Sequence, residues 1–473
     1  MPVGPDYHPD AQFAALGDEF SDAVEAADFP KSILRFRNQR AASGVGLDGL
    51  TDAEWLAAFA RFDPLPGQPG PRAMRYHGHQ FRSYNPDLGD GRGFLAAQLR
   101  EAGTQRLLDL GTKGSGTTPW SRSGDGRLTL KGGVREVLAA AMLEALGVPT
   151  SRAFSLVETG EALTRGDEPS PTRSAVLVRL QHSHVRFGTF QRLAHQNRPD
   201  LLRVLTGHVI ETYHPAAGGP AAMLEAIVAA TARMTARWMA AGFVHGVLNT
   251  DNMNVTGESF DYGPWRFLPR NDPNFTAAYF DQTGLYAFAR QPEAAFWNLQ
   301  QLAGALSLSE ADEALIAALN TFSPIYAREL TAAMIARLGL APASAEADIG
   351  LVNAAFKALA AGGEALRWEP FFFDWFGGAA SEARALGGPR SAIYGSEAFA
   401  AFRRQLEGRE PDRPERLGAA VFARAEPEEM LIDEVEKIWA AIDEKDDWSV
   451  FEDKLARIEA ANAAYGLADR SGI

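Results

Sequence analysis

Hydrophobic and polar positions follow a helical repeat in several long stretches of the chain. In residues 221–241, apolar side chains recur every three or four positions, and Gly242 follows where a C-terminal cap is expected. A second helix is predicted over 130–146, because a glycine and a proline come directly after it. Helices are expected again from Pro292 onward, and the last fifty residues mix acidic with apolar positions as amphipathic helices do.

Shorter runs between these helices have the composition of β-strands. Ser151–Val157 and Ser174–Leu180 are separated by a spacer rich in glycine and proline, which predicts two strands and a turn. Residues 1–61 are predicted to be polar and helical, and the proline- and glycine-rich stretch 62–71 marks a boundary. Residues 243–267 show no helical repeat and are expected to form a compact loop region.

These elements predict an α+β protein in which a small mixed lobe precedes a larger helical lobe. A chain of 473 residues is long enough for about three domains or one large bilobal unit. The predicted divisions are an N-terminal helical extension and linker (1–73), a mixed α/β lobe with glycine-rich loops (74–190), a helical lobe (191–305) and a helical C-terminal extension (306–473).

Composition narrows the classes of function. The chain has 60 acidic residues against 46 Lys and Arg, a net charge of −14 that disfavours nucleic acid or anionic membranes as partners. It contains no cysteine, which excludes disulfides, thiolate metal sites and a cysteine nucleophile. No signal peptide or transmembrane pattern stands out, so a cytoplasmic location is expected.

Three glycine-rich loops fall within forty residues, and each carries charge. Glycine lets backbone N–H groups approach a phosphate, and a neighbouring arginine or lysine supplies a positive charge. One such loop is most often only a turn, whereas three together favour a nucleotide site. The residues concerned are Gly89, Gly91 and Arg92 in the first loop, Lys113 in the second, and Asp125 and Gly126 in the third.

Lys113 precedes Glu136 by 23 residues, and Glu136 falls within the predicted helix 130–146. A strand lysine paired with a helix glutamate is the arrangement by which kinases place a cation on nucleotide phosphates. The alternative is an exposed ion pair worth about 0–1 kcal/mol with no part in the chemistry.

The segment from His245 to Val255, followed by Asp261-Tyr-Gly, carries the strongest chemical pattern. Protein kinases have H-R-D-x-x-x-x-N and then D-F-G, which supply a catalytic base and two metal ligands. Asn252 and Asp261 occupy the positions of the two metal ligands. Val247 occupies the position of the base and cannot accept a proton, but Asp251 provides a carboxylate beside Asn252.

Residues 253–261 are predicted to form a short hairpin that brings Asn252 and Asp261 together. Such oxygen ligands suit Mg²⁺ held with substrate phosphates, with Mn²⁺ as an alternative ion. The competing interpretation is an Asx-rich loop that only caps the next element. It leaves the histidine, the asparagine and the Asp-Tyr-Gly sequence unexplained.

Residues 178–188 supply two further cations, Arg179 and Arg186, to the same lobe. His182 and His184 in this stretch form an H-x-H pair, but no third zinc ligand is suggested nearby. We expect both histidines to serve hydrogen bonding or packing.

Taken in order, these motifs resemble the selenoprotein O family of pseudokinase-fold protein adenylyltransferases. The resemblance runs over about 76–305, and the chain before 74 and after about 320 matches poorly. The matching motifs are Gly-His-Gln-Phe (78–81), Leu-Gly-Asp-Gly-Arg (88–92), Lys-Gly-Ser-Gly (113–116), Thr-Pro-Trp-Ser-Arg (118–122), Gly-Asp-Gly-Arg (124–127), Arg-Glu (135–136), Ser-His-Val-Arg-Phe-Gly (183–188), His-Gly-Val-Leu-Asn-Thr-Asp-Asn-Met (245–253) and Asp-Tyr-Gly-Pro (261–264).

The resemblance implies a protein-kinase-like bilobal fold that binds ATP inverted relative to kinases and transfers AMP to Ser, Thr or Tyr hydroxyls of proteins. It implies Asp251 as the general base and Asn252 and Asp261 as Mg²⁺ ligands. The implied phosphate and nucleotide contacts are Lys113 oriented by Glu136, Arg179, Arg186, Gly89, Gly91, Arg92, Asp125, Gly126 and Asp261. Many members carry a C-terminal cysteine or selenocysteine, which this chain lacks.

Two other functions remain open at this point. One is a kinase-like enzyme that transfers the γ-phosphoryl group, and the other is an inactive nucleotide-binding scaffold. The presence of every expected polar residue argues against the scaffold, because decay usually deletes at least one of them.

Overall fold

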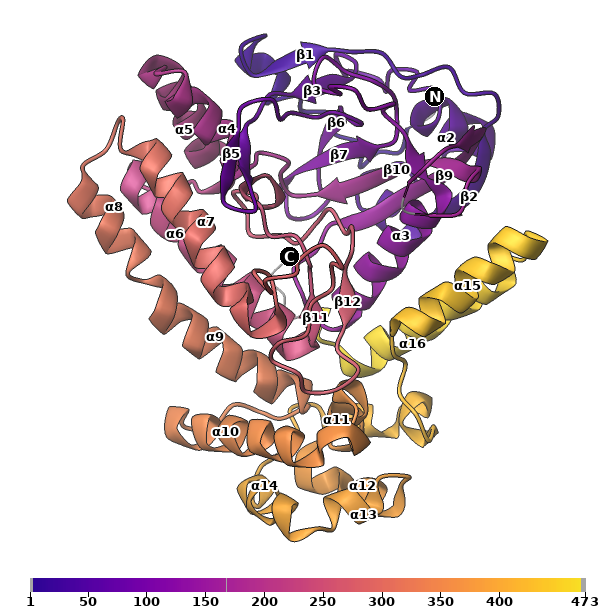
Figure 1. Cartoon of the computed structure of the whole chain (residues 1–473), viewed down its shortest axis with the longest axis vertical. Helices are drawn as coiled ribbons and strands as arrows, with labels where there is room; N and C mark the ends of the chain where they lie inside the picture. Colours follow the sequence, from indigo (N-terminus) through magenta and orange to yellow (C-terminus); the bar gives the residue numbers. More distant parts are fainter. Residues whose placement is uncertain (1–2, 167, 469–473) are drawn as a thin grey trace.

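The computed structural model describes residues 3–166 and 168–468. Within them, the largest sheet has eight strands with antiparallel pairing throughout (Figure 1). The strands lie in the order β1-β3-β6-β7-β10-β9-β2, and β8 pairs with β10. Their bounds are β1 Ser21–Ala23, β2 Ile33–Arg37, β3 Arg72–Met74, β6 Leu95–Arg100, β7 Leu107–Lys113, β8 Leu128–Thr129, β9 Arg152–Leu163 and β10 Thr172–Gln181.

The N-terminal region differs from its predicted helical character. It contains the short helices α1 (Gln39–Ser43) and α2 (Asp52–Phe59), but also β1 and β2, which form the two ends of the sheet. β2 reads Ile-Leu-Arg-Phe-Arg and pairs antiparallel with β9, a partner distant in the sequence that the local pattern of residues does not reveal. The stretch 62–71 is irregular, as its prolines and glycines predicted.

Helix α3 (Leu130–Ala145) confirms the predicted 130–146 helix, and it packs against β9 and β10. It begins at Thr129, whose side chain accepts a hydrogen bond from the Gly132 N–H. Gly133 allows close packing on the sheet, because a Cβ there would lie 2.4 Å from a Leu156 methyl carbon. The helix therefore presents Glu136 in a buried position beside the sheet.

The chain after the sheet is mainly helical, and Figure 1 shows these helices on one side of and below the sheet. Helix α6 confirms the predicted 221–241 helix and ends at Gly242, which has a left-handed φ of 64°. The helices are α4 Phe187–His195, α5 Pro199–Tyr213, α6 Pro220–Ala241, α7 Gln291–Leu306, α8 Asp312–Leu319 and α9 Phe322–Arg337. Two small two-stranded sheets accompany them, β4 Gly78–Gln80 with β5 Ser83–Asn85, and β11 Phe243–Val244 with β12 Arg266–Phe267.

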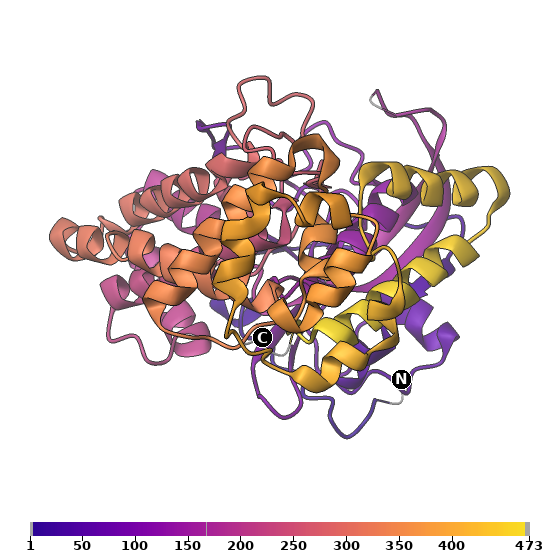
Figure 2. The same ribbon diagram turned by 90° about the horizontal axis from the view of Figure 1, so that it is seen from below.

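The C-terminal helices form a layer at the far end from the sheet and then return to it (Figures 1 and 2). Helix α16 packs against α3, so the acidic end of the chain covers the sheet's own helix. The bounds are α10 Ala345–Gly362, α11 Trp368–Asp374, α12 Glu382–Gly387, α13 Ser391–Tyr394, α14 Ala400–Leu406, α15 Ile432–Lys445 and α16 Ser449–Tyr465. No described helix combines the length and apolar character needed to span a bilayer.

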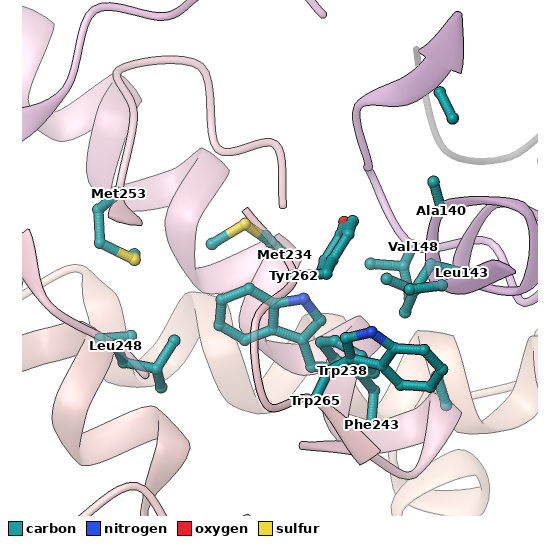
Figure 3. Close-up of a cluster of buried hydrophobic side chains, with 14 of the residues drawn as sticks. Ala140, Leu143, Val148, Met234, Trp238, Phe243, Leu248, Met253, Tyr262 and Trp265 are labelled. Carbon is teal, nitrogen blue, oxygen red and sulfur yellow. The ribbon is translucent and has the colours of Figure 1, made fainter. Parts of the chain in front are cut away.

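One continuous hydrophobic core joins the sheet's helix to the helical part. Figure 3 shows a portion of it, in which Leu143 of α3 and Trp238 of α6 lie with Phe243 and Tyr262. Tyr262 follows Asp261 directly, so this packing fixes the backbone on one side of the Asp-Tyr-Gly sequence. Close-packed interiors of this kind leave little freedom for the polar residues that they support.

Candidate active site

A buried ion-pair cluster joins the sheet, α3 and the Asp-Tyr-Gly loop. Lys113 ends β7, and its Nζ donates to Glu136 of α3 and to Asp261 Oδ1, the latter at 2.5 Å. Lys113 and Glu136 are both buried, with 6% and 2% exposure. Burial of this degree excludes the exposed ion pair, so the predicted strand–helix pairing is confirmed.

Asp261 is held in an unusual backbone conformation with a φ of 65°. Non-glycine residues in this region are uncommon and gather at functional sites. Its Oδ2 accepts a hydrogen bond of 3.0 Å from Asn252 Nδ2. Burial alone would raise its pKa, but Lys113, Arg179 and nearby cations hold the pKa well below the ordinary range, so Asp261 is ionised at neutral pH.

The loop between Asn252 and Asp261 is not the predicted hairpin. Its residues pair outward instead, Asn254 with Arg186 and Ser259 with Thr150. His245 supports the same region, because its ring Nε2 is 2.9 Å from the Phe260 carbonyl oxygen and burial lowers its pKa. The two metal-ligand candidates still meet, since neighbouring segments hold the loop closed.

Asp251 lies in the same loop but in a different electrostatic environment. Burial raises its pKa to about 6, opposed in part by the charge of Arg186. Its Oδ1 is buried and finds no hydrogen-bond partner among the described residues. Gly78 lies beside this oxygen and leaves it room, since a Cβ there would lie 3.3 Å from it. A carboxylate with a raised pKa and a free oxygen is suited to accept a proton.

Arg179 and Arg186 come from β10 and from the start of α4, and both side chains are buried. Arg179 Nη1 lies 3.5 Å from Asp261 Oδ1 and 3.7 Å from Glu136 Oε2. Arg186 Nη1 donates to the Asp251 main-chain oxygen at 2.7 Å, and its guanidinium stacks over the Tyr76 ring. The two predicted cations therefore flank Asp261 and Asp251 respectively.

The first glycine-rich loop packs closely against the Thr-Pro-Trp-Ser-Arg loop (118–122), which leaves no room for side chains at its glycines. A Cβ at Gly89 would lie 2.4 Å from the Trp120 ring, and one at Gly91 would lie 2.8 Å from the Trp120 carbonyl oxygen. Ser121 Oγ also donates to the Gly91 carbonyl oxygen at 2.5 Å. The Thr-Pro-Trp-Ser-Arg motif thus fastens this loop, and only the motif itself could have signalled the contact.

Two exposed arginines lie at the edge of the cluster, Arg92 and Arg122. Neither guanidinium forms a hydrogen bond or ion pair with another residue that the structure describes. The charge of Arg92 acts on Asp261 and that of Arg122 on Asp251. Arg92 was predicted for this site, whereas Arg122 was noted only as the end of the Thr-Pro-Trp-Ser-Arg motif and was given no role.

The third glycine-rich loop is placed differently from the first two. Asp125 is exposed, and its carboxylate pairs with Arg165 at 2.8 Å rather than with the Lys113 cluster. Gly126 has a φ of 70°, and its carbonyl oxygen accepts a hydrogen bond from the Gly116 N–H at 3.2 Å. This loop is therefore joined to the second glycine-rich loop through its backbone.

The rings of His182 and His184 are used in packing, and the main chain at both residues is hydrogen bonded. The main-chain N–H of His184 donates to Asp109 Oδ2 at 2.7 Å, and its ring lies against Gly111 of β7, where a Cβ would come within 2.2 Å. The main-chain N–H of His182 donates to Glu258 Oε2 at 2.6 Å, and its ring packs edge-on against Tyr213.

The oxygen atoms of this cluster suit a hard divalent cation that is shared with a substrate. Within residues 3–166 and 168–468, no group of three or more His, Asp and Glu side chains has a metal-binding arrangement. Asn252 nevertheless lies against Asp261, with its Nδ2 donating to the Asp261 carboxylate, and the free Asp251 Oδ1 belongs to the same loop. Mg²⁺ commonly uses one or two carboxylates and completes its shell with phosphates and water, so the donor set fits that ion.

Comparison with known proteins identifies the family. A family model described as protein adenylyltransferase SelO matches residues 6–459. The chain belongs to the SelO family. It is 46% identical to protein nucleotidyltransferase YdiU of Gloeobacter violaceus over 477 residues, covering 96% of this chain and 95% of that protein. The YdiU proteins of Synechocystis sp. (43% over 472 residues; 95% and 97% covered) and Synechococcus elongatus (54% over 333 residues; 69% and 67% covered) are also similar.

Membership of this family makes the protein a nucleotidyltransferase. It also corrects the expectation that only about 76–305 resembles the family, since the match extends through most of both flanking regions.

Proposed function

We propose that this protein transfers AMP from ATP to hydroxyl groups of Ser, Thr or Tyr in acceptor proteins, on a protein-kinase-like bilobal fold. The observation that carries the proposal is that two carboxylates in one loop have pKa values shifted in opposite directions. Asp261 is ionised and surrounded by cations, whereas Asp251 has a raised pKa and a free oxygen. Environments that separate two carboxylates in this way commonly assign them different roles.

In this proposal the oxygen of the acceptor hydroxyl forms a bond to the α-phosphorus of ATP, and Asp251 accepts the proton of that hydroxyl. The bond between the α-phosphorus and the bridging oxygen breaks, and pyrophosphate leaves. Asn252 and Asp261 would hold Mg²⁺, which when bound neutralises phosphate charge. Lys113, oriented by Glu136, would contact the phosphates in the same cluster.

The cations around the cluster favour pyrophosphate as the leaving group. Arg179 and Arg186 are buried there, and the unpaired Arg92 and Arg122 lie at its edge. Preorganised positive groups aimed at developing negative charge are a major source of catalysis, and pyrophosphate carries much charge. An ATP inverted relative to kinases would place its β- and γ-phosphates among these cations, with Gly89, Gly91, Asp125 and Gly126 lining the nucleotide.

The absence of a base at the kinase position agrees with this orientation. Val247 replaces the kinase aspartate, and the nearest carboxylate in the loop is Asp251. A different reacting phosphorus requires its base at a different place. The cytoplasmic location stays a prediction.

Labelled nucleotide distinguishes the possible reactions. With Mg²⁺, label from α-³²P-ATP is expected to become bound to protein, including the enzyme itself, while label from γ-³²P-ATP is not, and pyrophosphate is released. Incorporation of γ-label without α-label would refute AMP transfer and favour a kinase. Tight ATP binding with neither label incorporated would favour a scaffold.

A further inference from the structure

Three exposed aromatic side chains form one patch beside the loop that carries Asp251. Phe81, Tyr279 and Phe280 are 37%, 80% and 45% exposed. The ring centroid of Phe280 lies 5.9 Å from that of Phe81 and 5.1 Å from that of Tyr279. Phe81 precedes Tyr279 by 198 positions in the chain, so the fold assembles the patch.

The other large exposed apolar residues come singly from separate segments. They are Val204 of α5, Leu308 after α7, Ile316 of α8, Ile349 of α10 and Leu386 of α12. Scattered exposed apolar residues are ordinary on protein surfaces, whereas a contiguous group marks a contact surface. Among the described residues, the aromatic patch is therefore distinctive in its composition.

The backbone that presents Phe81 is strained. Phe81 and Arg82 form the two-residue turn between β4 and β5, with φ values of 49° and 65°. Turns with two positive φ values favour Asn and Gly, and a bulky aromatic residue there is disfavoured. The fold holds an unfavourable residue at this tip, which is the pattern expected of a residue kept for contact with another molecule.

Tyr279 and Phe280 are also held in place, although they are exposed. The residues on either side of the pair, Ala278 and Asp281, are buried. The Asp281 carboxylate accepts hydrogen bonds from the N–H groups of Leu285 and Tyr286, each 2.8 Å long. The segment is anchored at both ends, so its two aromatic rings project from a fixed base.

Asn249 connects this patch directly to the residues before Asp251. Its Oδ1 accepts hydrogen bonds from the Phe81 N–H at 3.0 Å and from the Tyr286 hydroxyl at 2.9 Å. The Tyr286 ring in turn lies 5.1 Å from the Phe81 ring. A polypeptide that brings a hydroxyl to Asp251 would therefore pass next to the aromatic rings.

We propose that Phe81, Tyr279 and Phe280 dock the acceptor polypeptide, through an apolar or aromatic side chain near the modified hydroxyl. This inference rests on the proposed function, because only a protein acceptor requires such a surface. The patch is continuous with the site of the reaction through the hydrogen bonds of Asn249. Arg82 beside it is paired with Glu293 at 2.9 Å, so the patch offers an apolar rather than a charged contact. Aromatic side chains are the usual anchors of such contacts.

The test uses short synthetic peptides with one central serine and otherwise glycine and alanine. Each flanking position is replaced in turn by Phe, Leu, Lys or Glu. Binding to the full-length protein is measured by fluorescence polarisation with ATP and Mg²⁺ present, and AMP transfer is measured with α-³²P-ATP. The wild-type protein is expected to prefer Phe or Leu at one fixed distance from the serine.

The double variant Tyr279→Ala/Phe280→Ala is expected to lose this preference, with affinity for the preferred peptides falling about tenfold or more while ATP affinity is unchanged. Ile316→Ala is the matched control, because it also removes an exposed apolar side chain but lies in α8. It is expected to behave as wild type in both measurements.

Equal binding of all peptides by the wild type, or an unchanged preference in the double variant, would overturn the docking surface. So would a double variant that changes only the oligomeric state, since the patch would then join two copies of the chain. Peptide preference with no α-label incorporated would contradict the transfer reaction and leave the docking surface supported, so the two failures are distinguishable.

Discussion

Replacing Asp251 by asparagine should stabilise the protein while it abolishes most of the activity. The raised pKa of Asp251 means that its ionised form is less favourable in the folded protein than in the unfolded chain. The charge therefore costs stability above about pH 6, and this cost disappears below the unfolded pKa near 4. Asparagine keeps the shape and removes the charge.

The size of the effect follows from the pKa. A rise from 3.8 to about 6 is about two pKa units, which corresponds to about 3 kcal/mol at pH 7.5. This is an upper value, because part of the Asp251 side chain remains exposed. At pH 5 the cost should be about half as large. With an unfolding entropy of about 2.1 cal/mol/K per residue, 473 residues convert 3 kcal/mol into a Tm increase of about 3 °C.

The assay compares wild type and Asp251→Asn by urea and thermal unfolding at pH 7.5 and pH 5, beside AMP transfer at pH 7.5. The rate is expected to fall about 10²–10⁴-fold, the usual contribution of a general base, with ATP binding nearly unchanged. Asp261→Asn is the matched control in the same loop. Its ionised form is stabilised by Lys113 and neighbouring cations, so its replacement should lower stability at pH 7.5.

Three results would refute this reasoning. A less stable Asp251→Asn protein at pH 7.5 would show that the carboxylate is satisfied in the folded state. A stability gain of equal size at pH 5 and pH 7.5 would show that charge is not its cause. Wild-type turnover in the variant would remove Asp251 as the base.

Four other measurements test the site residues and the absence of cysteine. The ratio of wild-type to Asp251→Asn transfer rates should fall about tenfold per pH unit below about pH 6. Taking the ratio removes the effect of ATP's own titration, which is the same for both proteins. A ratio that stays constant with pH would contradict the raised pKa of Asp251. Lys113→Met leaves the buried Glu136 and the half-buried Asp261 without their lysine, so we expect a loss of about 3 kcal/mol in unfolding free energy and at least tenfold weaker ATP binding by calorimetry. Gly89→Ala pushes a methyl group into an indole ring and should raise the KM for ATP several-fold, whereas Gly207→Ala, with open space around it, should not. Because the chain has no cysteine, its activity should be unchanged by dithiothreitol or diamide.

The order of elements and much of the site could be predicted from the sequence. The helices α3 and α6 were predicted within one or two residues, because their apolar positions repeat regularly and Gly242 ends the second one. The pairing of Lys113 with Glu136 was one of two interpretations of their spacing, and the burial of both residues decided between them. The wrong predictions fell on the strands before residue 61 and on the 253–261 loop, where partners are distant in sequence.

What the sequence by itself determined is the set of reactive groups: the cations, Asn252, the two carboxylates and the absence of any thiol. Only the tertiary structure decided how the two carboxylates differ in pKa. Asp251 and Asp261 are the same amino acid ten positions apart, yet one has a raised pKa and the other a lowered one. The reason is that the pKa of a carboxyl group depends on how much water the fold excludes from it and on which charges the fold places near it. Gly78, Lys113 and Arg186 come from three separate parts of the chain, and only folding brings them there.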